Sequence, residues 1–178
     1  MKNIRSISAL IALALTAALA LGACGANEGS APMGFKEISN DGVDYNLYVP
    51  DEWISNISTG VTAAYYSNVD DSNISMITFT QSDELKTPEK YWETYESSLA
   101  ALFADFEYVS KPDKATLDGA DAIQCTYTGN VADHEYTIMQ LVAAKGTQIY
   151  IFTYTAASDK YDAHIEDVIA ILDYFEFN

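Results

Sequence analysis

Histidine, cysteine and basic side chains are scarce in this sequence. The 178 residues include two histidines, two cysteines and nine lysines and arginines, against 26 aspartates and glutamates. So acidic a chain is repelled by nucleic acid and by anionic lipid head groups, which excludes nucleic acid as a partner. Zinc sites usually need three or four nitrogen or sulfur ligands, and the few such side chains make one strained. We therefore expect no metal and no other cofactor.

Sequence motifs of catalysis are also missing. The chain has no glycine-rich phosphate-binding loop, no G-x-S-x-G turn and no H-E-x-x-H helix. Serine hydrolysis would need a serine, a histidine and a carboxylate brought together in space, which the sequence neither excludes nor suggests. We expect a protein that is not an enzyme.

The sequence has no apolar run long enough to span a membrane. Its longest run, from Ala9 to Gly22, has 14 residues and is interrupted only by Thr16, whereas a spanning helix needs about 20. Lys2 and Arg5 precede the run, and small residues follow it. This order of charged, apolar and small residues predicts a cleaved export signal over residues 1–23.

The end of that signal, Leu21-Gly22-Ala23-Cys24, resembles the lipobox of bacterial lipoproteins. The resemblance implies that Cys24 receives a diacylglyceryl group and becomes the first residue of the mature chain. Two acyl chains give a stable anchor where one holds only marginally. We expect an extracytoplasmic protein held through Cys24 on the outer face of a bacterial membrane; which membrane stays open, and the alternative is an ordinary secretory signal with a chance cysteine.

The mature chain is predicted to be one tethered domain. Residues 24–34 comprise Cys24 and a small, polar segment broken by Pro32, whose ten residues after Cys24 reach at most about 35 Å. Removal of residues 1–23 leaves seven basic and 26 acidic residues, a net charge of −19. Cys125 is then the only thiol, so no intramolecular disulfide can form, and residues 35–178 must rely on an ordinary core.

Alternation of apolar and polar residues predicts the strands. Asn and Asp between residues 68 and 73 indicate a turn, as does the pair Lys145-Gly146, and Phe175 and Phe177 alternate like a short last strand. Residues 149–154 are apolar on both faces, so their strand should be central and covered on both sides. The main predicted strands are residues 45–49, 63–67, 74–80, 122–128, 135–144 and 147–156.

Two amphipathic helices are predicted. Thr87 offers an N-cap with Pro88 at the first helical position, and apolar side chains then recur at spacings of three and four through Phe106. A second helix starts near Ser158 and Asp159 and carries Tyr161, Ile165, Val168 and Leu172. Strand hairpins alternating with helices predict an α+β domain: a mainly antiparallel sheet with helices on both faces, an α/β/α sandwich. The first helix should bury Trp92, Tyr95, Leu99, Leu102 and Phe106.

Three segments of the domain resemble the PsbP-like family. They are Tyr45-Asn-Leu-Tyr-Val-Pro-Asp-Glu-Trp53, the turn Leu117-Asp118-Gly119-Ala120, and Tyr150-Ile-Phe-Thr-Tyr154 before the last helix. The resemblance covers nearly all of residues 35–178. It implies the fold of an extrinsic subunit of the photosynthetic oxygen-evolving complex and of a Ran-binding import factor, and a docking module without chemistry of its own. It transfers no partner.

Few side chains are candidates for chemistry. His134 lies between Asp133 and Glu135, where a solvated hairpin turn is the simplest interpretation and a metal ligand the sharper one. His164 has Asp167 three residues on and Lys160 one turn earlier. The histidine and Asp167 could ligate a metal or share a hydrogen bond, but the spacing favours an exposed ion pair. Asp70 and Asp71 lie in a turn that lacks the glycine and the terminal glutamate of a calcium-binding EF-hand loop.

The last candidate residues are the thiol of Cys125 and the tyrosines. Cys125 lies between Ile123 and Tyr127 on one strand face, which predicts a buried, inert thiol. Thirteen tyrosines favour a protein-binding surface, because tyrosine is enriched at interfaces. The leading hypothesis is a docking or accessory module for an envelope protein or complex. The alternative is a small-ligand or divalent-cation binding lipoprotein, and the oligomeric state is unknown.

Overall fold

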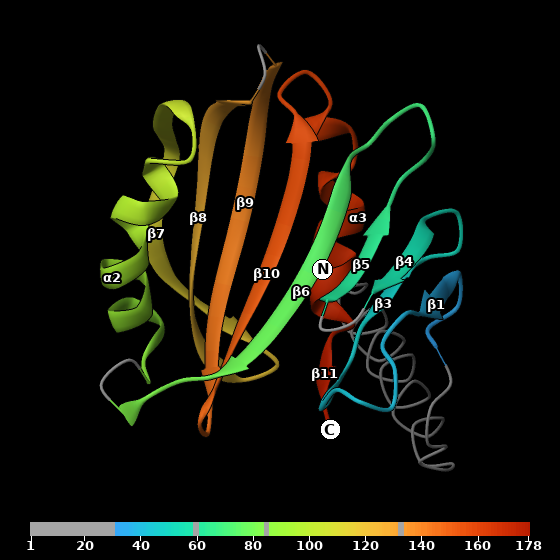
Figure 1. Cartoon of the computed structure of the whole chain (residues 1–178). Helices are drawn as coiled ribbons and strands as arrows, with labels where there is room; N and C mark the ends of the chain where they lie inside the picture. The colour runs from blue at the N-terminus through green and yellow to red at the C-terminus, as the bar shows by residue number, and fades with distance from the viewer. Residues whose placement is uncertain (1–30, 59–60, 84–85, 132–133) are drawn as a thin grey trace, which may run out of the picture. The chain divides into compact units, whose positions relative to one another are not determined.

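Figure 1 shows the computed structural model of the chain, in which residues 31–178 form one compact unit. The structure describes residues 31–178 except 59–60, 84–85 and 132–133. The predicted signal, Cys24, most of the predicted tether and Asp133 lie outside these described residues. Among the helices of the described part, none has the length and apolar character needed to cross a membrane.

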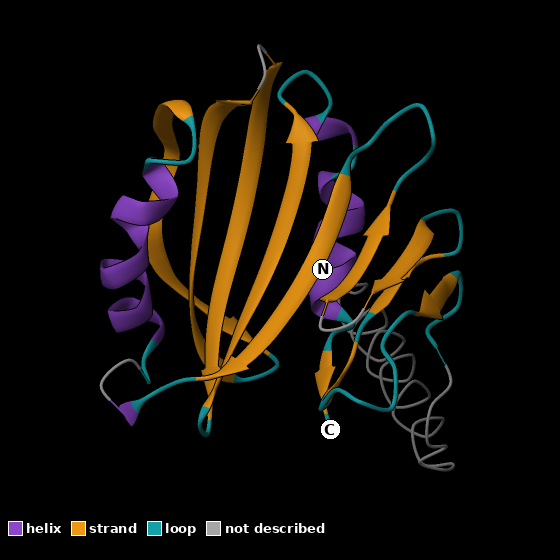
Figure 2. Ribbon diagram, viewed as in Figure 1, coloured by secondary structure: helices purple, strands orange, loops and turns teal. Residues whose placement is uncertain are grey.

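A seven-stranded antiparallel sheet forms the centre of the described unit (Figure 2). In spatial order the strands are β4 (Ile54–Ser58), β5 (Val61–Tyr65), β6 (Asn73–Thr80), β10 (Gln148–Ala157), β9 (His134–Lys145), β8 (Ala120–Val131) and β7 (Ala104–Leu117). The chain leaves the sheet after β6, forms helix α2 (Pro88–Ala100), and returns at the far edge as β7, so that three later strands fold back until β10 pairs with β6.

Two tight turns set the register of the long strands. Asp118 and Gly119 both have positive φ, 42° and 75°, as a two-residue hairpin between β7 and β8 requires. Gly146 has φ 62° in the turn between β9 and β10. The hairpin predicted at Lys145-Gly146 is confirmed.

Two short ladders lie beside the main sheet. One pairs β1 (Phe35–Glu37) with β3 (Tyr48–Pro50), and the other pairs β2 (Tyr45–Asn46) with β11 (Glu176–Phe177). The strand predicted over residues 45–49 is therefore split between two partners. Its inward side chains are as expected, because Tyr45, Leu47 and Val49 are all buried in the core.

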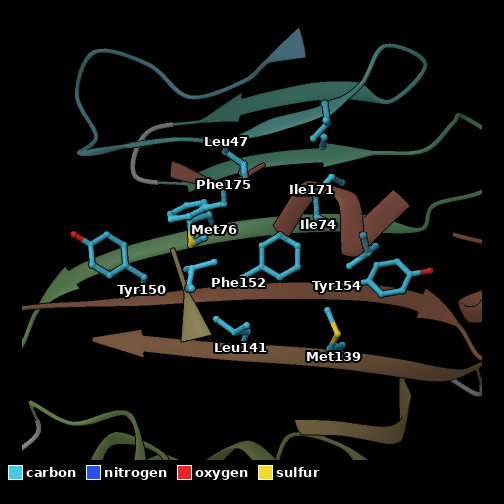
Figure 3. Close-up of a cluster of buried hydrophobic side chains, with 14 of the residues drawn as sticks. Leu47, Ile74, Met76, Met139, Leu141, Tyr150, Phe152, Tyr154, Ile171 and Phe175 are labelled. Atoms are coloured by element: carbon cyan, nitrogen blue, oxygen red, sulfur yellow. The ribbon is translucent and has the colours of Figure 1, made fainter. Parts of the chain in front are cut away.

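The larger core lies between the sheet and helix α3 (Ile165–Asp173). The helix begins at Ile165 after the short 3-10 turn η2 (Tyr161–Ala163), later than predicted, and buries Val168 and Ile171 more deeply than the predicted Leu172. Figure 3 shows how side chains of the sheet meet those of α3 and the terminal segments. The labelled members of this core are Leu47, Ile74, Met76, Met139, Leu141, Tyr150, Phe152, Tyr154, Ile171 and Phe175.

A second core lies on the opposite face of the sheet, under α2. The Thr87 hydroxyl accepts the Lys90 N–H, so the predicted N-cap is confirmed. Tyr91, Trp92 and Leu99 of the helix pack against the α2-side residues of β8, β9 and β10. Ile149 and Ile151 belong to this core whereas Phe152 and Tyr154 belong to the other, so β10 is covered on both faces and the predicted α/β/α arrangement is confirmed.

The first helix is shorter than its apolar spacing predicts. It ends at Ala100, Leu102 is 70% exposed, and Phe106 belongs to β7, where its ring contacts Tyr127 of β8. Past the end of the helix, Asp105 has a positive φ of 57° within β7. The long edge strand β7 and the short β4 were not predicted, because pairing with a neighbouring strand overrides local spacing.

Candidate functional site

The turn between β5 and β6 holds a carboxylate in a fixed position. Asp70 Oδ1 accepts hydrogen bonds from the backbone N–H of Ser72 at 3.1 Å and from its hydroxyl at 2.7 Å. The Ser67 hydroxyl accepts the Asp70 N–H at 3.1 Å. The Asn- and Asp-rich segment therefore forms a turn, as predicted, because its short polar side chains bond their own backbone.

The second oxygen of the same carboxylate faces the start of α3. His164, the residue before that helix, is buried, and its Nε2 lies 3.0 Å from Asp70 Oδ2. Burial by itself would raise the pKa of Asp70, but the hydrogen bonds from Ser72 and His164 outweigh it and lower that pKa to about 2. The carboxylate is thus ionised at neutral pH and can only accept, so Nε2 of His164 carries the proton.

Two aromatic rings surround the His164 imidazole. The Tyr66 ring lies against it with centroids 4.0 Å apart, and the Trp53 ring meets both at 6.0 Å, edge to face. Trp53 Nε1 donates to Asp167 Oδ2 at 3.0 Å. We call Asp70, Ser72 and His164 with these two rings the polar cluster, because it joins the β5–β6 turn to α3 through polar side chains.

The polar cluster is arranged for holding elements together. In serine hydrolysis the histidine must accept the serine proton while the acid binds the far side of the imidazole. Here the Ser72 hydroxyl donates to Asp70 instead, so the acid lies between serine and histidine. Both carboxylate oxygens are occupied by protein donors, which leaves this serine without a base.

The exposed ion pair predicted for His164 is wrong. Its partner is Asp70, 94 residues earlier, while Asp167 binds Trp53, and the histidine side chain is only 8% exposed. Spacing along a helix reports neighbours on that helix only, so no local pattern could reveal a partner in a distant turn. A buried histidine needs a hydrogen-bond partner, but nothing near His164 in the sequence identifies that partner.

A depression with acidic walls lies at the ends of β9 and β10. It encloses about 480 Å³ and is lined by His134, Tyr136, Ala157, Ser158 and three carboxylates, Asp71, Glu135 and Asp159. His134 is exposed at the first position of β9, in the solvated hairpin that the sequence predicted. Among the residues that the structure describes, no three acidic, histidine or cysteine side chains are placed to hold a metal ion.

Cys125 is buried in the second core, as predicted. Burial, together with the nearby Glu96 carboxylate, raises the pKa of its thiol to about 12, so it stays protonated near neutral pH. Part of the tyrosine content belongs to the core. Six of the thirteen tyrosines are buried, and the hydroxyls of Tyr45, Tyr150 and Tyr154 bond to Thr62, to Asp44 and to the Tyr161 carbonyl.

Comparison with known proteins relates the chain to others by fold alone. No protein-family model matches the sequence, and neither does any curated protein. Cyanobacterial PsbP from Synechocystis superposes with a TM-score of 0.59 at 18% identity, over 89% of this chain and 99% of its own. LpqN, involved in cell envelope biogenesis of Mycobacterium tuberculosis, has 0.59 at 17%, over 75% and 83%.

A third similar structure is the Ran-binding protein Mog1p of Saccharomyces cerevisiae. Its TM-score is 0.58 at 10% identity, over 82% of this chain and 96% of its own. The chain has the PsbP-like fold that its sequence segments predict.

Proposed function

We propose that this protein is a lipid-anchored accessory module of the bacterial envelope, which binds another extracytoplasmic protein and catalyses no reaction. The observation that carries the proposal is the bonding of the polar cluster. Both oxygens of Asp70 are occupied by Ser72 and His164, so the one buried histidine–carboxylate pair among the described residues serves structure.

The fold supports the same function. LpqN is involved in cell envelope biogenesis and Mog1p is a Ran-binding protein, and both have a similar fold. Attachment at Cys24 would place the domain outside the cell, within the reach of a short tether. An acidic domain cannot hold itself on anionic lipid, so the acyl chains must supply the attachment.

Lipid attachment is tested by substituting each cysteine in turn. Cys24→Ala should abolish fatty-acid labelling and membrane fractionation, because no other residue offers the lipidated thiol. Cys125→Ala is the matched control, since it removes the other thiol and should leave both signals unchanged. Wild-type labelling of Cys24→Ala would contradict the anchor.

Protein docking is tested by crosslinking on intact cells. The exposed lysines, which include Lys111, Lys114 and Lys160, provide sites for a cleavable amine-reactive reagent that does not enter the cell. We expect one reproducible partner, captured by the wild type and lost with Cys24→Ala. Absence of any partner above an untagged strain would overturn docking, and turnover of an ester, glycoside or peptide panel would overturn the non-catalytic assignment.

A further inference from the structure

One face of the main sheet is left partly uncovered by the described helices. It consists of the α2-side residues of β6, β5 and β4, which we call the open face. Figure 1 shows α3 behind these strands and α2 at the opposite side of the sheet, beside β7 and β8. In β6 and β5 the register pairs Asn73 with Tyr65, Ser75 with Ala63 and Ile77 with Val61.

Two paired isoleucines in adjacent strands show where the core under α2 ends. Ile151 of β10 and Ile77 of β6 are directly paired and lie on the same side of the sheet. Ile151 is 7% exposed in the core under α2, whereas Ile77 is 39% exposed. Ile54 of the edge strand β4, which pairs with Tyr65 on the same side of the sheet at the other end of β5, is also exposed. The uncovered area thus extends from β6 to the sheet edge.

The open face carries no charge. Its paired positions in β5 and β6 are isoleucine, valine, alanine, tyrosine, serine and asparagine, in a chain with 26 acidic residues. Along a strand with one solvated face, core residues alternate with charged or polar ones, so that the solvated face is polar. Uncharged, partly apolar side chains over three strands instead resemble the centre of a protein interface, where charged residues are depleted.

Charge returns abruptly at one end of the open face. Ala157 and Tyr136, a paired position on the same side of the sheet, lie two residues beyond Thr155, which pairs with Asn73. Both line the depression whose walls carry Asp71, Glu135 and Asp159. A neutral area therefore adjoins an acidic hollow about 7 Å further along the strands.

The neutral open face and the acidic hollow beside it together favour one kind of binding partner. A second copy of the chain would bring two strongly acidic bodies together, and an anionic membrane would be repelled. We propose, resting on the docking function above, that the open face binds a folded protein domain of defined chemistry. That domain presents an uncharged, partly apolar area with lysine or arginine side chains at one margin, and these enter the acidic hollow.

The site is tested with a photoreactive amino acid in the full lipidated chain on cells. Placed at Ile77, it should crosslink the same partner that the lysine reagent captures. Val109 of β7 and Ile169 of α3 are matched controls, because they are apolar and 66% and 52% exposed but lie outside the open face. We expect no crosslink to that partner from either control.

The affinity and association rate of the purified partner domain then test which side chains form the contact. Ile77→Lys should weaken the affinity at least about tenfold by putting a charge into an apolar contact, while Ile169→Lys should not change it. Glu135→Gln with Asp159→Asn should slow association and flatten its dependence on salt, because the basic margin loses its attraction. Circular dichroism and thermal unfolding check that each variant is folded; if Ile77→Lys is not, Ile54→Lys at the sheet edge replaces it.

The outcomes separate this inference from the proposed function. A partner captured by the lysine reagent but crosslinked from Val109 or Ile169 would keep the docking function and overturn the open face. Crosslinks from Ile77 to a second copy, or to residues 24–34 of the same chain, would overturn the proposed occupant. A captured domain that is acidic at the contact would do the same. No partner with either reagent would overturn docking itself.

Discussion

The two faces of the main sheet differ in how completely they are covered. On the α3 side, core packing runs continuously from β8 to β5 and the terminal segments, and the polar cluster joins the β5–β6 turn to the helix. On the α2 side, the core ends near Ile151 and Phe79, and the open face follows. The side of the sheet that α3 and the terminal segments cover is therefore packed across its strands, whereas the open face is both partly uncovered and uncharged.

Charge placement makes the same contrast. The α3 side uses a half-buried carboxylate, Asp70, and both of its oxygens accept hydrogen bonds, because a charge withdrawn from water without partners is destabilising. On the open face Ile77 and Ile54 are exposed and the other paired positions of β5 and β6 are half-buried, yet none of them carries a charge. We interpret the hydrogen-bonded Asp70 carboxylate as a feature of stability and the uncharged open face as a feature of binding. Three measurements test that distinction.

The largest effect is expected from the centre of the α3-side core. Phe152 is completely buried, and Phe152→Ala removes its ring from a packed interior. The loss of buried area and the cavity left behind should lower the free energy of unfolding by about 3–5 kcal/mol. Denaturant unfolding of residues 31–178 measures it. A loss below about 1 kcal/mol would mean that this core is not packed as the structure has it.

Acid should weaken the polar cluster next. The pKa of Asp70 is about 2 in the fold against an ordinary 3.8, so the folded state favours the ionised form. This stabilisation is fully present above about pH 5 and is lost as the pH falls through 4 toward 2; the shift corresponds to about 2 kcal/mol. Asp70→Asn keeps the shape without the charge, so its loss of stability on acidification should be smaller.

The control for the acid experiment is the adjacent carboxylate. Asp71 is exposed and outside the cluster, so Asp71→Asn should follow the wild-type pH dependence closely. Denaturant titrations between pH 6 and pH 2 on the three proteins separate Asp70 from the other acidic groups. Parallel curves for Asp70→Asn and the wild type would show that the carboxylate does not stabilise the fold through its charge.

Local sequence rules predicted the parts of this fold that are determined locally. The N-cap at Thr87, the hairpin at Gly146 and the two-sided burial of β10 follow from residue types a few positions apart. The end of α2 was missed because Leu102 and Phe106 keep helical spacing, whereas Phe106 contacts Tyr127 across a strand pair. That contact depends on where β8 lies, which spacing within the segment does not encode.

The site was less predictable than the fold for the same reason. His164 meets Asp70 over 94 residues, and the open face exists only once β4, β5 and β6 are in register. Each of its residues reads along the chain as an ordinary strand position. Only pairing shows that they share one side, and only the position of α2 shows that this side is uncovered.

The smallest effect is expected on the open face, and a matched pair makes it decisive. Ile77 and Ile151 are paired across β6 and β10, so Ile77→Thr and Ile151→Thr remove the same atoms at one level of the sheet. Burying a hydroxyl under α2 should lower the free energy of unfolding by about 2 kcal/mol at Ile151, against under about 1 kcal/mol at Ile77, where water reaches the side chain. Equal losses in the isolated domain would mean that the open face is covered in solution, and a docking surface would have to be sought elsewhere. A loss confined to Ile151 leaves Ile77 with no role in stability, so that any effect of Ile77→Lys on partner affinity belongs to the interface.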